Sequence, residues 1–184
     1  MKDPATIIHG IRQRLLAHFE KNAPPLAPEE ATPAESGRLL YAPVTGRIRA
    51  LTRIKDPVFS SEVLGKGCAI EPSCGEVVAP ADGIVKKIAK THNAVSLLCD
   101  NGLEVLIHVG MDTVEMQGKG FTPLVKVDQK VKAGTPLLKV DLAAIGAAGH
   151  PKSTAVIVTN ADDLPQIQIV GSGTVEAGAP LFKF

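Results

Sequence analysis

Short runs of β-branched and apolar residues, separated by glycine, proline and turn dipeptides, dominate the sequence from residue 38 onward. The clearest runs span residues 83–88, 94–98, 103–109 and 153–159. Asp82-Gly83 and Asn101-Gly102 border these runs, and glycine tolerates the positive φ that tight turns need. Runs this short, punctuated about every ten residues, are typical of antiparallel strands. We therefore predict an all-β fold, an antiparallel sandwich or barrel.

Two stretches of the sequence recur. Residues 42–48 (APVTGRI) are echoed by 79–85 (APADGIV), and residues 130–138 (KVKAGTPLL) are echoed by 174–182 (TVEAGAPLF). Two copies of two elements predict a sandwich built from a duplicated strand-turn-strand unit. The alternative is that Gly-Pro turns converge on similar strings, and both interpretations keep the all-β class.

The first 37 residues have a different character. Residues 1–22 are predicted to form a short amphipathic helix, with Asp3 and Pro4 at its start and an apolar stripe on one side. Residues 23–37 are rich in proline and glutamate and are predicted to be a linker. The compact domain is then expected to span 38–184. The helix could rest weakly on an anionic membrane or be a solvated tether.

Composition excludes several classes of function. A net charge of +1 and an aromatic content of 3% argue against a nucleic-acid binder. No apolar run is long enough to span a membrane, and no secretory signal is visible. Three cysteines are too few and too irregular for a disulfide framework or zinc site, so we expect a cytoplasmic protein. Glycine-rich phosphate cradles and metal-binding histidine pairs are missing, so we expect neither cofactor nor metal.

His108 is the strongest candidate for chemistry. It stands near the end of the apolar run 103–109 and is followed by Gly110 and Asp112. A strand end that enters a glycine turn can present a reactive side chain on rigid support. A neutral imidazole is a nucleophile that can accept a group reversibly. The alternative is a core or rim histidine whose nitrogens bond to backbone carbonyls.

Four stretches resemble one known family. Residues 56–72, 78–85, 104–121 and 152–160 are similar, in order and spacing, to the glucose-type enzyme IIA of the bacterial sugar phosphotransferase system. The run EVLIHVGMDTVEMQGKGF at 104–121 looks like the phosphorylation-site signature of that family. The resemblance covers about residues 40 to 184 and is specific.

The resemblance implies a fold and an activity. The fold would be an antiparallel β-sandwich with a duplicated, lipoyl-like hybrid motif. The protein would take a phosphoryl group from the phosphocarrier HPr and pass it to the IIB unit of a IIB/IIC sugar permease. By motif match the acceptor would be His108. Such transfer needs positioning and charge stabilisation more than acid–base chemistry.

The resemblance also implies a docking surface around the acceptor. The family surrounds its site with an apolar depression, whose matching residues are Val58, Phe59, Leu106 and Val114. Its carboxylates that meet an arginine of HPr match Asp56 and Asp112. A carboxylate–guanidinium contact would orient the partner.

One departure from the family concerns a second histidine. Family members carry it fifteen residues before the acceptor, in a Thr-x-His-Ala pattern, whereas the matching residues are Thr91, His92, Asn93 and Ala94. One residue along a strand reverses the direction of the side chain, so we expect Asn93 to face His108 and His92 to point away, unless a bulge redirects it. An asparagine amide can donate a hydrogen bond but carries no charge.

Two functions follow from this. The first is a phosphocarrier in which His108 is transiently phosphorylated. The alternative is a regulatory IIA-like binding module, acting on regulatory protein partners, whose phosphotransfer is impaired by Asn93. A lipoyl-like carrier is disfavoured because Lys132 and Lys139 lie at ordinary strand ends.

Overall fold

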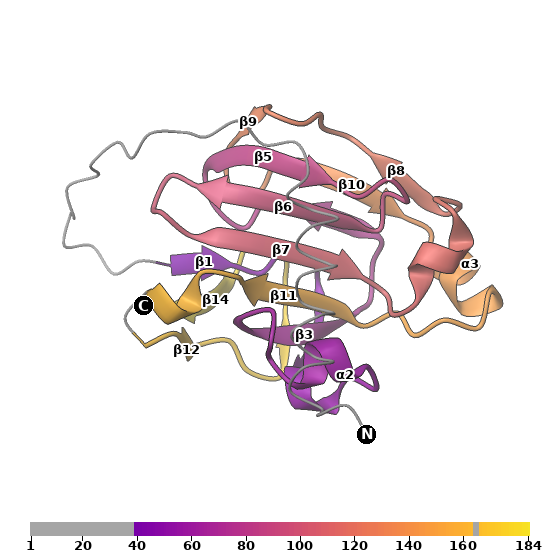
Figure 1. The fold of residues 1–184 in the computed structure, drawn as a ribbon, viewed down its shortest axis with the longest axis horizontal. Coiled ribbons are helices and arrows are strands. Elements are labelled where there is room, and N and C mark those ends of the chain that lie inside the picture. The colour runs from indigo at the N-terminus through magenta and orange to yellow at the C-terminus, as the bar shows by residue number, and fades with distance from the viewer. Residues whose placement is uncertain (1–38, 164–165) are drawn as a thin grey trace, which may run out of the picture.

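The computed structural model of the protein describes residues 39–163 and 166–184, and these form a layered β structure (Figure 1). The predicted helix at 1–22 and the predicted linker at 23–37 lie outside the described residues. Within the described part, every strand pairing is antiparallel. The predicted all-β antiparallel class is therefore confirmed.

The largest sheet of the described residues has eight strands. Their spatial order is β13 (Thr174–Val175), β2 (Gly46–Ala50), β3 (Lys66–Pro72), β11 (Thr154–Val158), β7 (Glu104–Val109), β6 (Ala94–Cys99), β5 (Gly83–Ile88) and β9 (Lys130–Val131). Strand β7 lies near the middle of this sheet, between β11 and β6. Its backbone is thus hydrogen-bonded on both sides, which makes it a rigid support.

Two three-stranded sheets complete the strand layers. One has the order β4 (Glu76–Val78), β10 (Pro136–Val140) and β8 (Phe121–Pro123), and the other β1 (Leu39–Tyr41), β14 (Pro180–Lys183) and β12 (Gln168–Ile169). The helical segments are η1 (Leu51–Arg53), α2 (Pro57–Ser60), η2 (Thr113–Met116), α3 (Leu142–Ala147) and η3 (Ala161–Asp163). They are all short, and no helix in the described residues is long and apolar enough to cross a membrane.

The repeated stretches of sequence occupy equivalent places in the structure. Gly46 pairs with Val175 in one copy, and Gly83 pairs with Val131 in the other. The backbone bonds match as well, because Gly178 N–H donates to Ala42 just as Gly134 N–H donates to Ala79.

The two copies also bond to each other. Tyr41 N–H donates to the Pro80 carbonyl, and Val78 N–H donates to the Pro43 carbonyl. In the alignment of the two copies, residues 41 and 43 correspond to 78 and 80, so these two bonds are reciprocal. The similar strings are therefore a duplicated strand-turn-strand unit, as predicted.

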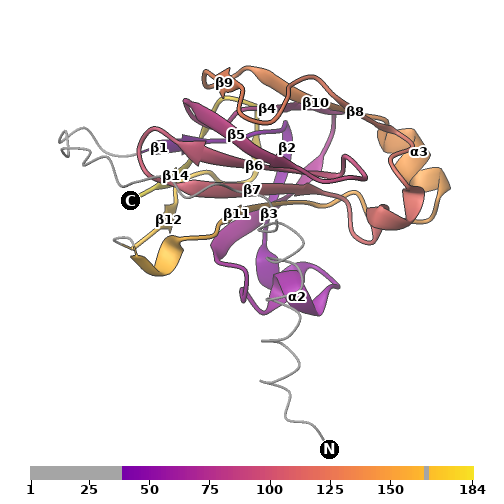
Figure 2. The same cartoon turned by 45° about the horizontal axis from the view of Figure 1, so that its top comes forward.

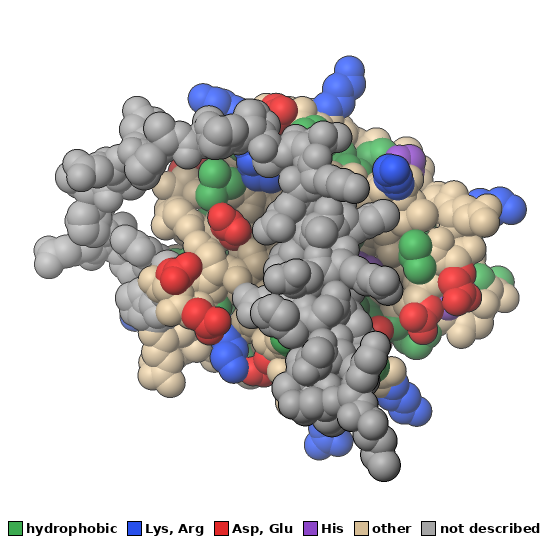
Figure 3. All heavy atoms as spheres, viewed as in Figure 1, with side chains coloured by type: hydrophobic (Ala, Val, Ile, Leu, Met, Phe, Trp, Pro, Cys, Tyr) green, Lys and Arg blue, Asp and Glu red, His purple; other side chains and the backbone are tan. Residues whose placement is uncertain are grey.

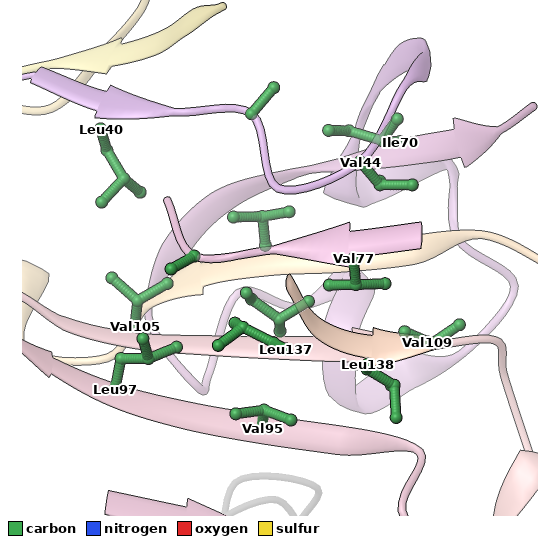
Figure 4. Packing of buried hydrophobic residues seen from close by; sticks show 14 of the residues in the cluster. Leu40, Val44, Ile70, Val77, Val95, Leu97, Val105, Val109, Leu137 and Leu138 are labelled. Carbon is green, nitrogen blue, oxygen red and sulfur yellow. The ribbon is translucent and has the colours of Figure 1, made fainter. Parts of the chain in front are cut away.

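The main hydrophobic core lies between the large sheet and the smaller ones. In Figure 4, Val95, Leu97 and Val105 of the large sheet point toward Leu137 and Leu138 of β10. Leu137 is fully buried. Closely packed apolar side chains of this kind supply most of the free energy of folding.

Strand β7 divides its side chains between two apolar clusters. Val105, Ile107 and Val109 belong to the main core, whereas Leu106 belongs to a second cluster on the opposite face of the sheet. That second cluster is covered by η1 and α2, and Figure 2 shows α2 on the side of the large sheet away from β10. Because strand side chains alternate, His108 shares the face of Leu106.

We predict that Leu137→Ala lowers the free energy of unfolding by about 2–5 kcal/mol, because it leaves a cavity between the sheets. Lys139→Ala, at an exposed position of the same strand, is the matched control and should change stability by less than about 0.5 kcal/mol. Urea denaturation followed by circular dichroism measures both. Equal stability of the two variants would contradict the position of Leu137 in the core.

Candidate functional site

His108 lies on β7 between two alanines. Its Cα partners are Ala94 on β6 and Ala155 on β11, and both are almost completely buried. Small neighbours on either side leave room above the sheet for the imidazole ring. The ring of Phe59, from α2, packs on it with a centroid distance of 4.9 Å and an interplanar angle of 52°.

The two nitrogens of His108 have different surroundings. The side chain as a whole is partly exposed, but Nδ1 is buried and makes no hydrogen bond of ordinary geometry. Nε2 lies 3.3 Å from the amide nitrogen of Asn93. Of the two ring nitrogens, Nε2 is therefore the one that contacts a polar side chain.

Burial lowers the pKa of His108 to about 4. The backbone of Gly110 and the carboxylates of Asp56 and Asp112 oppose this shift, since they favour the protonated ring, but their effect is smaller. The imidazole is consequently neutral at physiological pH. A neutral ring retains the lone pair that a nucleophile needs.

Asn93 connects His108 to two threonines. Its amide Nδ2 donates to the hydroxyl of Thr113 at 3.1 Å, besides the contact with Nε2 of His108, and its Oδ1 accepts from the hydroxyl of Thr91 at 2.7 Å. Asn93 and Thr113 are both buried. A buried polar side chain is costly unless it is bonded, and here every atom of the amide has a partner.

His92 occupies a different environment. It has a φ of +57°, in the left-handed region, and precedes β6, which begins at Ala94. A Cβ placed on Gly118 would lie 3.7 Å from Nδ1 of His92, so the ring borders the loop that follows η2. Asn93 is the residue that contacts His108, but strand alternation is the wrong reason. Residues 91–93 form a turn, and the left-handed backbone of His92 determines which way the side chains of His92 and Asn93 point.

The local sequence at Asp56-Pro57 explains the position of Phe59. Asp56 caps α2, its carboxylate accepting from Val58 N–H at 2.8 Å and Phe59 N–H at 3.3 Å. Proline at the first position suits a helix start. This cap holds α2 against the sheet with Phe59 turned inward and the Asp56 carboxylate partly exposed.

The other residues predicted to surround the His108 ring differ in how far they are buried. Leu106 is buried and Val58 is half-buried, and both pack in the cluster beneath α2. Val114 of η2 is 57% exposed, which is unusual for a valine. Asp112, also exposed, precedes η2 with a φ of +57°. In Figure 3, acidic and apolar side chains gather on the right of the viewed face, where η2 lies in Figure 1.

Thr113 was not predicted from the sequence. It is fully buried, and its hydroxyl donates to the Val109 carbonyl at 2.7 Å while accepting from Asn93. The only sequence signal for Thr113 was its place inside the stretch 104–121. The residue types around it do not indicate that a threonine in a turn is buried. Among the described residues, no group of three or more His, Cys, Asp or Glu side chains could hold a metal ion.

Comparison with known proteins gives a consistent result. Residues 38–164 match the family of the phosphoenolpyruvate-dependent sugar phosphotransferase system, EIIA 1. The glucose-specific EIIA component of Oceanobacillus iheyensis is 39% identical over 139 residues, which are 76% of this chain and 84% of that protein. The structure of the glucose permease IIA from Mycoplasma capricolum matches with a TM-score of 0.74 and 32% identity, covering 81% of this chain and 96% of that one.

Longer relatives contain a similar stretch. The beta-glucoside-specific EIIBCA component of Dickeya chrysanthemi is 45% identical over 142 residues, which are 77% of this chain but only 22% of that protein. The chain thus spans about a fifth of the length of such relatives. Since the match at 38–164 includes strands β1 to β11 and the segment around His108, the chain belongs to the EIIA 1 family of the phosphoenolpyruvate-dependent sugar phosphotransferase system and is a glucose-type enzyme IIA.

Proposed function

We propose that His108 accepts a phosphoryl group from phosphorylated HPr and passes it to the IIB unit of a sugar permease. The observation that carries this proposal is a neutral imidazole whose Nδ1 is buried and whose Nε2 faces an amide donor. Relatives that unite EIIA with EIIB and EIIC in one chain support the IIB/IIC unit as the recipient.

The proposed transfer requires no net movement of protons. The N–H of Asn93 passes from Nε2 to a phosphoryl oxygen, which frees the lone pair on Nε2 of His108. That lone pair attacks phosphorus, and the phosphorus–nitrogen bond to the histidine of HPr breaks. The bonding electrons return to the donor ring, which leaves as neutral imidazole, while Nδ1 of His108 keeps its own hydrogen. Chemistry of this kind depends on positioning and on charge stabilisation. The apolar surroundings of the ring would also slow loss of the phosphoryl group to water.

The carboxylates near the ring suit a cationic partner surface. Asp56 and Asp112 both raise the pKa of His108 electrostatically, so both carboxylates lie near the same ring. We infer that they receive a guanidinium group of HPr, which steers the encounter and fixes its orientation. Val58 and Val114 would supply apolar contact around that ion pair. The same rim would then receive IIB, since both partners must reach Nε2.

We predict that His108→Ala abolishes phosphorylation, because it removes the imidazole that contacts Phe59 and Asn93. The measurement is transfer of radiolabel from phosphorylated HPr, and His92→Ala is the matched control that should retain labelling. Label on the His108→Ala protein would refute the assignment of the acceptor.

We predict that the imidazole of His108 titrates with a pKa near 4, as followed by NMR. An ordinary histidine would be about 90% protonated at pH 5.5, whereas this ring stays neutral because burial disfavours its charge. Its ability to attack phosphorus should therefore persist down to about pH 5 and fall below that. A measured pKa near 6.5 would mean that the ring is not desolvated.

A second candidate is a regulatory binding module, and Asn93 is the observation that favours it. The amide can donate to a phosphoryl oxygen but cannot balance its charge, as a protonated histidine could. The loss of a charge-assisted hydrogen bond corresponds to about 1–2 kcal/mol. If that loss falls on the transfer state, onward transfer is slower by about tenfold.

We therefore predict that Asn93→His accelerates transfer from the phosphorylated protein to IIB by about tenfold. Quenched-flow measurement of label moving from His108 to IIB tests this, with acceptance from HPr measured in parallel on the same samples. Asn93→Ala serves as the control that removes the donor altogether and should be slower than the natural chain. An unchanged or slower Asn93→His protein would argue that the amide already suffices.

A further inference from the structure

The amide of Asn93 could in principle lie in either of two orientations. In the first, Nδ2 faces His108 and Thr113, and in the second, Oδ1 does. The two orientations have opposite consequences for His108. An amide N–H needs a lone pair on Nε2, whereas an amide oxygen needs a hydrogen there.

Thr113 settles which orientation is allowed. Its hydroxyl hydrogen is committed to the Val109 carbonyl at 2.7 Å, so the oxygen can only accept from Asn93. If Oδ1 faced this hydroxyl, two acceptors would meet in a buried place with no donor between them. Thr91 imposes no such choice, because its hydroxyl can either donate or accept.

The position of Thr113 is itself held by packing. A Cβ on Gly110 would lie only 2.4 Å from Cγ2 of Thr113, so the glycine makes the space for that methyl group. The carbonyl that receives the hydroxyl belongs to Val109, the residue after His108 on the central strand. Val109 N–H in turn donates to the Asn93 carbonyl at 2.8 Å. Thr113, Asn93 and the strand of His108 thus form one connected unit.

We propose that Thr113 is a positioning residue, which aims an N–H of Asn93 at Nε2 of His108 and thereby keeps the lone pair on that nitrogen and the hydrogen on Nδ1. This deepens the proposed function, on which its importance for phosphotransfer rests. Without the Thr113 hydroxyl, the amide is free to turn, and the tautomer with hydrogen on Nε2 becomes accessible. That tautomer has no lone pair at the nitrogen that must attack phosphorus.

The test compares Thr113→Val, which removes the hydroxyl, with Thr113→Ser, which retains it. Thr154→Val is the matched control, because Thr154 is also fully buried and pairs with Val109 but bonds to Lys152 and not to Asn93. The readout is the tautomer of His108 from the ¹⁵N chemical shifts of its two ring nitrogens. The rate of labelling by phosphorylated HPr is measured beside it.

We expect the natural chain, Thr113→Ser and Thr154→Val to hold hydrogen on Nδ1. Thr113→Val should shift the ring toward hydrogen on Nε2 and lower the rate of labelling by about tenfold. A Thr113→Val protein that keeps the original tautomer would overturn the proposal. A natural chain whose His108 carries hydrogen on Nε2 would also overturn the proposal. That measurement does not depend on whether any variant folds.

The two readouts separate this proposal from the proposed function. If His108 of the natural chain takes no label while the tautomer responds to Thr113→Val, the phosphocarrier function fails and the positioning role stands. If labelling is normal in every variant and the tautomer does not respond, only the positioning role fails.

Discussion

The site depends on one geometric property of an extended chain, namely that successive side chains of a strand point to opposite faces of the sheet. On β7 this alternation sends Val105, Ile107 and Val109 into the main core. The same alternation leaves Leu106 and His108 on the other face, beneath α2. The free energy gained by burying the valines and the isoleucine therefore also holds the imidazole in place. A slip of one residue in register would bury His108 in the main core.

A second constraint comes from the cost of leaving buried polar atoms without partners. Asn93 and Thr113 are buried within the rim, and their hydrogen bonds form a chain that ends at the backbone of β7. Because the Thr113 hydroxyl gives its hydrogen to the Val109 carbonyl, the amide has one orientation. The polar contact of Nε2 thus depends on two side chains that are almost completely buried. In our proposal, this network also sets which nitrogen of the imidazole carries its hydrogen.

Much of the fold could be predicted from local patterns. Alternating apolar runs and glycine turns indicated antiparallel strands, and the repeated strings at 42–48 and 79–85 indicated a duplicated unit, because both signals depend on neighbouring residues only. The choice between Asn93 and His92 was harder. Alternation along a strand favoured Asn93, but the residues belong to a turn in which His92 has a positive φ. Thr113 gave no signal beyond its place in the stretch 104–121, since its burial depends on the space beside Gly110 and on the carbonyl of Val109.

The amino-acid sequence alone thus determined the strand class, the duplicated unit and the stretch that contains His108, because each of these follows from the spacing of residue types along the chain. The tertiary structure decided which nitrogen of His108 is buried, how strongly burial lowers the pKa of the ring, and which side chains surround it. Those properties arise from residues such as Phe59, Asn93 and Thr113, which are distant from His108 in sequence and meet it only when the sheet and its covering segments pack together.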